Sequence, residues 1–363
     1  MNVYNPENQC CKINSGVRNS NLELYRILCM LMIVAHHFVV NSGLTSPDGS
    51  LIQYPTAVNS LYLWSIGMWG KTGINCFLMI TGYFMCKSSI RLRKFIKLIS
   101  QIYFYNIVIF LIFLFAGYEQ VTLLRLVYLI MPVWNFESNF VSCFIVFWLT
   151  IPFWNILIHN MSKKQHEWLL LLLLSAYTVL GSIPKFHVSF NYITWFGIIY
   201  LIASYIRLYP IKVFSNTRLW ALLTLLSISI AALSMYVMVL YLGGGYGQYF
   251  VADSNKIFAV TTAVVSFLWF KNIHIPYSKT INLIGGSTFA VLLIHANSSA
   301  MRTWLWQDTV DCVGNYQQPL LELTAYSLFV VIAIFASCIL IDRVRILLIE
   351  KPLFQWYDKR YLK

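Results

Sequence analysis

Charged residues are scarce in this chain, and acidic ones most of all. Asp, Glu, Lys and Arg make up 11% of its 363 residues, and only 13 of these are acidic. Soluble globular domains carry about a quarter charged residues. Hydrophobic residues reach 59% and aromatic residues 17%. This composition excludes an ordinary soluble domain and indicates an integral membrane protein.

Paired metal-binding motifs are also missing. The 8 cysteines show no CxxC and no Cys/His spacing of the kind that holds zinc, so we expect no metal site. Most of them lie in apolar segments, where cysteine acts as a small core residue. No repeat of fixed period is present. The polar first 20 residues are followed by no small-residue cleavage site, so we expect the first span to stay as an anchor.

Apolar segments long enough to cross a bilayer, about 20 residues each, recur along the chain. We expect ten membrane helices, at 23–42, 63–86, 95–116, 139–159, 167–184, 190–208, 217–242, 255–271, 281–301 and 319–342. The segment 121–131 is apolar but short and contains Arg125, which indicates an interfacial or re-entrant piece. The fold class predicted is therefore all-α, a polytopic membrane helix bundle with about ten transmembrane helices.

Lysine and arginine predict the orientation of this bundle, because they collect on cytoplasmic flanks. With the N-terminus inside, 21 of the 26 Lys and Arg residues fall on the inner side and 5 on the outer side. Residues 1–20 and 346–363 are then cytoplasmic tails around a transmembrane domain at 21–345. The bases are spread over all inner loops, so the net charge of +13 indicates topology and not nucleic-acid binding.

Arg26 and His37 are ionisable residues of the predicted first span and are candidate functional residues. Eleven helical steps return to within about 20° of the starting direction, so both side chains share one face about 16 Å apart. His36 lies about 80° away from the direction of Arg26. Ionisable groups inside a membrane helix usually face a bundle interior or a wet cavity. Imidazole is suited to proton transfer near pH 7, although a histidine satisfied at a helix contact is the alternative.

Two further charged groups lie near the predicted inner surface. Glu23 precedes Arg26 by three residues, a spacing that allows an ion pair on one helix face. This pair either secures the helix end or holds Arg26 for an anionic ligand. A basic cluster of Arg91, Arg93 and Lys94 begins the third span. Such residues commonly anchor a helix among anionic lipids, and they also suit the phosphates of a nucleotide-type donor.

His295 lies in the predicted outer half of the ninth span, at a depth similar to that of His37. As an isolated histidine it would be structural. Its match in depth to His37 makes a shared cavity the competing interpretation.

Together with several further segments, Glu23, Arg26, His37, the basic cluster and His295 form a pattern that resembles the acyltransferase-3 family of multi-pass membrane O-acyltransferases. The resemblance is in particular to bacterial members that modify capsular and other surface polysaccharides. Asn75 and Cys76 depart from the acidic and bulkier residues usual in that family, and Lys94 occupies the second place of its Arg-x-x-Arg pattern. The similar segments keep the family's order along nearly the whole chain: Glu23, Arg26 and His37, 73–84, the basic cluster, 195–209, 287–295 and 350–352.

The resemblance implies transfer of an acyl group, usually acetyl, from cytoplasmic acyl-CoA to a glycan hydroxyl. His37 would be the general base or a transient acyl carrier, and Arg26, oriented by Glu23, would bind donor phosphate or developing charge. The basic cluster would bind coenzyme A, and His295 would act on the acceptor side. No permanently bound cofactor is implied.

The implied partners are acyl-CoA, membrane lipids and a surface polysaccharide or its lipid-linked precursor, and the implied location is the cytoplasmic membrane. The alternative is a transporter or flippase for a glycan-lipid or a small metabolite, in which the same intramembrane charges would form a substrate path.

Overall fold

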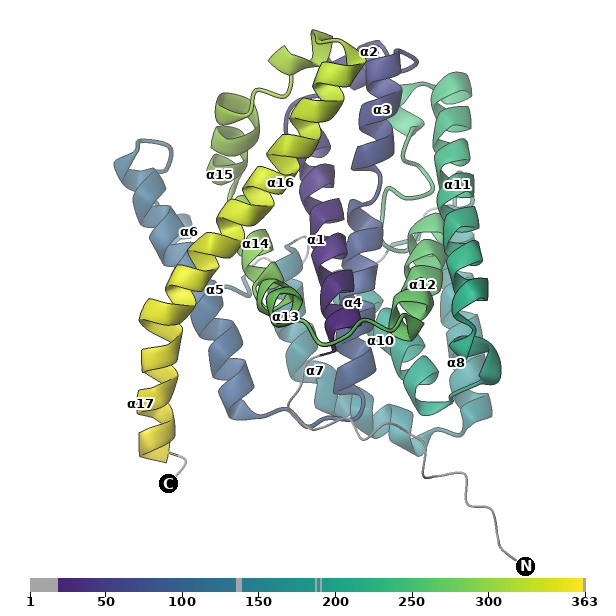
Figure 1. The fold of residues 1–363 in the computed structure, drawn as a ribbon, viewed down its shortest axis with the longest axis vertical. Helices are drawn as coiled ribbons and strands as arrows, with labels where there is room; N and C mark the ends of the chain where they lie inside the picture. Colours follow the sequence, from purple (N-terminus) through teal and green to yellow (C-terminus); the bar gives the residue numbers. More distant parts are fainter. Residues whose placement is uncertain (1–18, 135–138, 187, 190, 362–363) are drawn as a thin grey trace, which may run out of the picture.

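The computed structural model describes residues 19–134, 139–186, 188–189 and 191–361 (Figure 1). Within these residues all regular structure is helical and no strand occurs, which confirms the all-α prediction. The α-helices are α1 Ser20–Val40, α2 Ser50–Gln53, α3 Val58–Gly67, α4 Gly70–Met85, α5 Leu92–Phe115, α6 Leu123–Ile130, α7 Phe140–Asn160, α8 Lys163–Leu174, α9 Leu180–Ser182, α10 Tyr192–Leu208, α11 Thr217–Leu242, α12 Ile257–Asn272, α13 Lys279–Gly285, α14 Thr288–His295, α15 Ser299–Thr303, α16 Leu320–Arg345 and α17 Lys351–Tyr361.

Short turns of other helix types continue several of these helices. The π-helical turns are η2 Ser175–Val179, η5 Trp304–Thr309 and η7 Ile346–Glu350, and the 3₁₀ turns are η3 Lys212–Ser215, η4 Gly244–Tyr246 and η6 Gly314–Gln317. The region 346–363, predicted as a C-terminal tail, is therefore helical through Tyr361. The predicted N-terminal tail and its Cys10 and Cys11 lie almost wholly outside the described residues.

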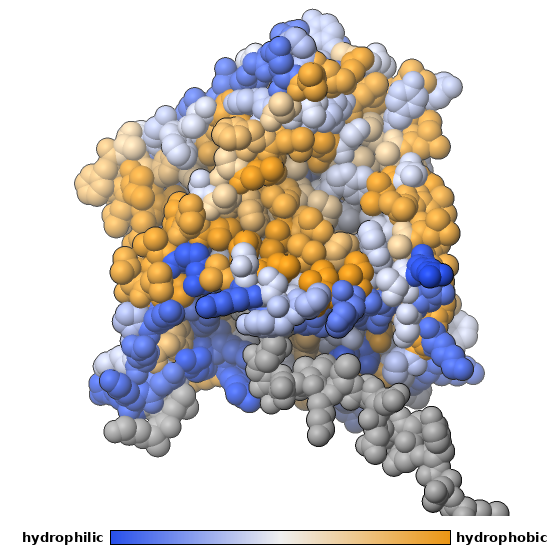
Figure 2. Space-filling model, in the orientation of Figure 1, coloured by the Kyte–Doolittle hydropathy of each residue, from blue (hydrophilic) through white to orange (hydrophobic). Residues whose placement is uncertain are grey.

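Five helices of the described chain are long and apolar enough to cross a membrane, namely α1, α5, α7, α11 and the continuous helix at 320–360. A sixth span is formed if the helices at 279–295 and 299–317, which meet at 98°, are counted together. The apolar α10 and α12 are shorter. A hydrophobic band crosses the molecule between two hydrophilic ends, as expected of a protein embedded in a bilayer (Figure 2).

Two of the expected spans are interrupted. The segment 63–86 is divided into α3 and α4, and the segment 281–301 into α13, α14 and α15. At the first break the α1 helix packs very closely, since a Cβ on Gly67 would lie 2.8 Å from Val39 and one on Gly70 would lie 2.2 Å from His36. Apolar residues continue through the first break, at Met68 and Trp69, so hydropathy alone does not mark it. The second segment has Gly286 and Ser287 at one break and Asn297 and Ser298 at the other.

The α1 helix occupies the middle of the bundle. It packs against α3, α4, α12, α13, α14 and α16, and Figure 1 shows it enclosed by these helices. Because neighbours surround it, a polar side chain on α1 meets another helix and not lipid. Its ionisable residues are therefore placed where a bundle can pair them.

Asn75 of α4 is fully buried and makes three hydrogen bonds. Its Nδ2 donates to the carbonyls of Ser254 at 2.7 Å and Ala259 at 3.2 Å, and its Oδ1 accepts from Trp195 Nε1 at 2.8 Å. A carboxylate has no proton to donate to either carbonyl. The amide therefore fits this site where an aspartate would not, which accounts for the departure from the family pattern.

We expect Asn75→Asp to destabilise the protein by about 3 kcal/mol, because it buries a charge facing two carbonyl oxygens. The midpoint of thermal unfolding in detergent measures this. Asn106→Asp is the matched control, since Asn106 only accepts a hydrogen bond, from Asn297 at 3.0 Å, and a carboxylate retains that role. Equal melting temperatures for the two variants would contradict the account of Asn75.

Candidate functional site

His37 and His295 form a hydrogen-bonded pair inside the bundle. His37 Nδ1 lies 2.8 Å from His295 Nε2, and the two rings are centred 5.0 Å apart. His295 is fully buried, whereas His37 is half-buried. The structure thus brings together two predicted site residues that are 258 positions apart in the sequence.

The partners of these rings decide which nitrogens carry protons. His295 Nδ1 lies 2.5 Å from the carbonyl oxygen of Val291, which only accepts, so this nitrogen is the donor. In the neutral ring His295 Nε2 is then an acceptor, and His37 Nδ1 must donate to it. That leaves the Nε2 lone pair of His37 unprotonated, with no hydrogen-bond partner among the described residues. This is the arrangement of a general base with an orienting partner.

His36 points to a different neighbour. Its Nδ1 lies 2.5 Å from the carbonyl oxygen of Gly67, which is the last residue of α3. At the break between α3 and α4 the helix can no longer supply a donor to this carbonyl, and the imidazole does so instead. His36 thus stabilises the helix break, and His37 alone of the two faces His295.

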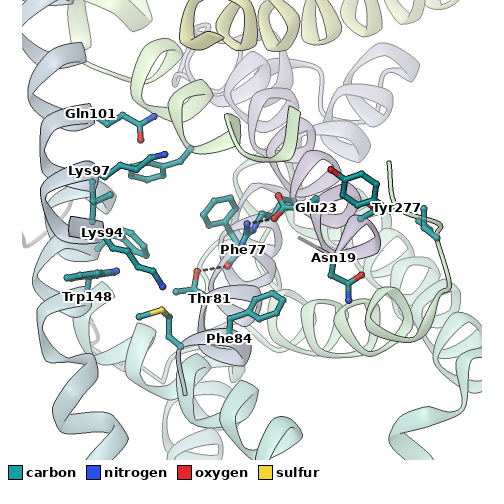
Figure 3. A pocket seen from close by; sticks show the side chains of 17 residues that line it. Asn19, Glu23, Phe77, Thr81, Phe84, Lys94, Lys97, Gln101, Trp148 and Tyr277 are labelled. Atoms are coloured by element: carbon teal, nitrogen blue, oxygen red, sulfur yellow. Dashed lines mark hydrogen bonds and ion pairs between the residues drawn. The ribbon is translucent and has the colours of Figure 1, made fainter. Parts of the chain in front are cut away.

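A pocket of about 810 Å³ opens near the N-terminal end of α1 (Figure 3). Lys94, Lys97 and Trp148 lie on one side of it, and Glu23 and Tyr277 on the other (Figure 3). Arg26 also lines this pocket, so it carries three cations and one acid. Such a lining favours an anionic ligand.

The histidine pair does not line this pocket, but α14 connects the two. Phe289 forms part of the pocket wall and precedes His295 by six residues, which is about 9 Å along a helix. On α1, Arg26 of the pocket and His37 of the histidine pair are eleven residues apart. The histidine pair and the pocket therefore lie at different depths beside the same two helices, α1 and α14.

Glu23 and Arg26 form the ion pair that their spacing predicts. Arg26 Nη1 lies 2.8 Å from Glu23 Oε1, and the carboxylate is almost fully buried while the guanidinium is partly open. A Cβ on Gly285 would lie 2.4 Å from the other carboxylate oxygen, so only glycine leaves room for Glu23 there. The backbone of α13 thereby holds Glu23 against Arg26.

The structure separates the members of the basic cluster. Lys94 lines the pocket, whereas Arg91 precedes α5 as an exposed residue outside the lining. Arg93 turns to α17, where its Nε and Nη2 lie 2.9 and 2.8 Å from the two carboxylate oxygens of Asp358. Lys97, one turn further along α5 and not among the predicted donor-binding residues, takes the second place in the pocket.

A network of ion pairs, buried except at Lys97, supports the α5 wall. Lys97 Nζ lies 2.5 Å from Glu350 Oε1, and Arg345 Nη2 lies 2.8 Å from Glu350 Oε2. Arg345 Nε also contacts Asp342 Oδ1 at 2.8 Å. Glu350 ends the π-helical turn η7, in which residues five apart face each other, and this geometry brings it back to Arg345.

The sequence did not predict the aromatic residues that line the pocket. Trp148 of α7 stacks on Phe95 with ring centres 5.4 Å apart, and Tyr277 is 65% exposed beside the pocket. In a chain with 17% aromatic residues no pattern separates these two from the rest. Across the described ranges no group of three or more His, Cys, Asp or Glu residues could hold a metal ion.

These helices and buried ionisable groups define an integral membrane protein with an interior site. A family model described as an acyltransferase domain matches residues 19–342, and the chain belongs to the acyltransferase-3 family. The protein is thus a membrane acyltransferase. No curated protein and no solved structure gives a significant match.

We expect Gly285→Ala to lower the rate of acyl transfer about tenfold, because the added methyl group displaces the Glu23 carboxylate and loosens Arg26. Initial rates in isolated membranes with labelled acyl donor measure this, normalised to protein content. Gly245→Ala is the control, since a Cβ there meets nothing within 4 Å. A Gly285→Ala enzyme as fast as the control would rule out the proposed coupling between α13 and Arg26.

Proposed function

We propose that this membrane acyltransferase moves an acetyl or similar acyl group from cytoplasmic acyl-CoA to a hydroxyl of a surface polysaccharide or its lipid-linked precursor. The observation that carries the proposal is the His37–His295 pair, because it leaves an unprotonated imidazole nitrogen inside the bundle of an acyltransferase. The flanking pocket and its cations supply a place for the donor.

The pocket has features that suit coenzyme A. Arg26, Lys94 and Lys97 can contact its phosphates, and arginine does so through two parallel hydrogen bonds. Lys94 lies in the first turn of α5, where the partial positive charge of the helix end adds to the attraction for anions. Trp148 and Tyr277 offer flat faces on which an adenine ring can stack.

The chemistry at the histidine pair follows from the proton positions. His37 Nε2 removes the proton of the acceptor hydroxyl, and the oxygen attacks the thioester carbonyl carbon of the donor. The carbon–sulfur bond then breaks, and the coenzyme A sulfur leaves with the proton that His37 returns. His295 keeps the ring of His37 oriented and shares its positive charge through the hydrogen bond. A transient acyl group on Nε2 is the competing route.

The orientation proposed places both termini and the pocket on the cytoplasmic side of the cell membrane. Ten membrane crossings then result if the shorter helices α10 and α12, the α8–α9 segment and both broken segments cross together with the long ones. The excess of lysine and arginine on inner flanks supports this arrangement. In it the donor arrives from the side where acyl-CoA is made.

His37→Ala should abolish transfer of label from radiolabelled acetyl-CoA to purified surface glycan, because no base remains to activate the hydroxyl. Isolated membranes containing the variant, at an expression level matched to wild type, provide the test. His159→Ala serves as control, since His159 is exposed on α7 and bonds only to its own helix. Normal labelling by His37→Ala would refute the assignment, and absence of labelling by the wild type would favour the transporter.

Lys97→Ala and Lys94→Ala should each raise the KM for acetyl-CoA about tenfold, the effect of losing one charged contact worth about 1.4 kcal/mol. Their KM for the glycan should stay unchanged, because the pocket holds the donor. Arg91→Ala removes an exposed cation outside the pocket and provides the comparison. Equal donor KM values for all three variants would exclude this pocket as the donor site.

A further inference from the structure

A second cavity of about 670 Å³ lies on the other side of α14, between α5, α14–α15 and α16–η7. With one exception its lining side chains are apolar or aromatic. The exception is Arg345, whose guanidinium is already bound by Asp342 and Glu350. Ile112 of α5, which is 57% exposed, and Leu348 of η7, which is 71% exposed, belong to its walls. We call this cavity the apolar groove.

The wall between the apolar groove and the histidine pair is a single helix. Ile294 of α14 lines the groove, and the next residue, His295, bonds to His37 on the interior side. The groove extends along α5 to Met301 and Trp304, in the segment that follows the 98° bend. Trp306 of the same segment packs edge-on against the His295 ring, with centres 6.2 Å apart. One short segment therefore borders both the groove and the histidine pair.

A cation lies on the segment that borders the groove. Arg302 lies between Met301 and Trp304 in the sequence, and its Nε donates to the carbonyl of Ser298 at 3.2 Å. The residue as a whole is exposed, although its Nε bond is partly buried. An apolar groove with an arginine on its bordering segment is complementary to a hydrocarbon chain that ends in a phosphate.

We propose that the apolar groove binds the isoprenoid chain of a lipid-linked glycan, with its phosphate at Arg302 and its first sugars beside His37. The inference rests on the function proposed above and selects, among its acceptors, the lipid-linked precursor over the free polysaccharide. A free polysaccharide has no hydrocarbon to fill the groove. Anchoring the chain also raises the local concentration of the sugar hydroxyl at the histidine pair.

The experiment compares two forms of one acceptor, the lipid-linked glycan extracted from producing cells and the same glycan after mild acid has released its lipid. Ile112→Trp fills the groove and should raise the KM for the lipid-linked form about tenfold or more, because the indole takes the space that the isoprenoid chain needs. The KM for the released glycan should not change. Leu222→Trp on α11 is the matched control, being 64% exposed and outside the groove.

Arg302→Gln provides a second variant that leaves the groove walls intact, and it should raise the KM for the lipid-linked form alone. If the wild type uses both forms equally, or if the two variants affect both forms alike, the groove holds an ordinary membrane lipid and the inference is overturned. If the wild type labels neither form from acetyl-CoA, the proposed acyl transfer fails instead, so the two failures are distinguishable.

Discussion

The hydrogen bond between His37 and His295 is the interaction on which the rest of the site depends. An imidazole placed inside a helix bundle without a partner costs several kcal/mol, and a low dielectric strengthens the bond that removes this cost. The bond requires α1 at the centre of the bundle and α14 beside it, with the Val291 carbonyl fixing the proton on His295. The broken ninth segment meets this requirement, because α14 ends at His295 and the chain then turns through the 98° bend.

Helical periodicity predicted what lies within one helix. The phase of α1 places Arg26 and His37 on one face, and the three-residue spacing of Glu23 and Arg26 gives the observed ion pair. Hydropathy also located long, uninterrupted spans, and the expected helix at 217–242 coincides with α11, Thr217–Leu242. Both signals are local, since they depend only on neighbours along the chain.

The sequence could not reveal features that depend on distant residues. At the helix break before Gly70, α1 approaches too closely for a side chain, and the apolar residues around it carry no mark of that contact. The different positions of Arg93 and Lys94, both members of the basic cluster, also depend on distant residues. Arg93 is held by Asp358 of α17, a helix in a region that composition indicated only as a tail. Lys97 lines the pocket, and Arg93 does not.

The difference in chemistry between the two cavities matches the different solvents from which their proposed ligands would come. A donor with several phosphates is strongly hydrated, so a pocket must offer cations that replace its water, and Arg26, Lys94 and Lys97 do so at one end of α1. An isoprenoid chain already lies in hydrocarbon and gains little from burial, so the apolar groove only needs to position it, and Arg302 supplies the polar contact. Between the two cavities stands α14, with Phe289 on the pocket and Ile294 on the groove. A reaction between a charged donor and a membrane-bound acceptor needs its base on such a dividing helix or against it, and His37 is held there by His295.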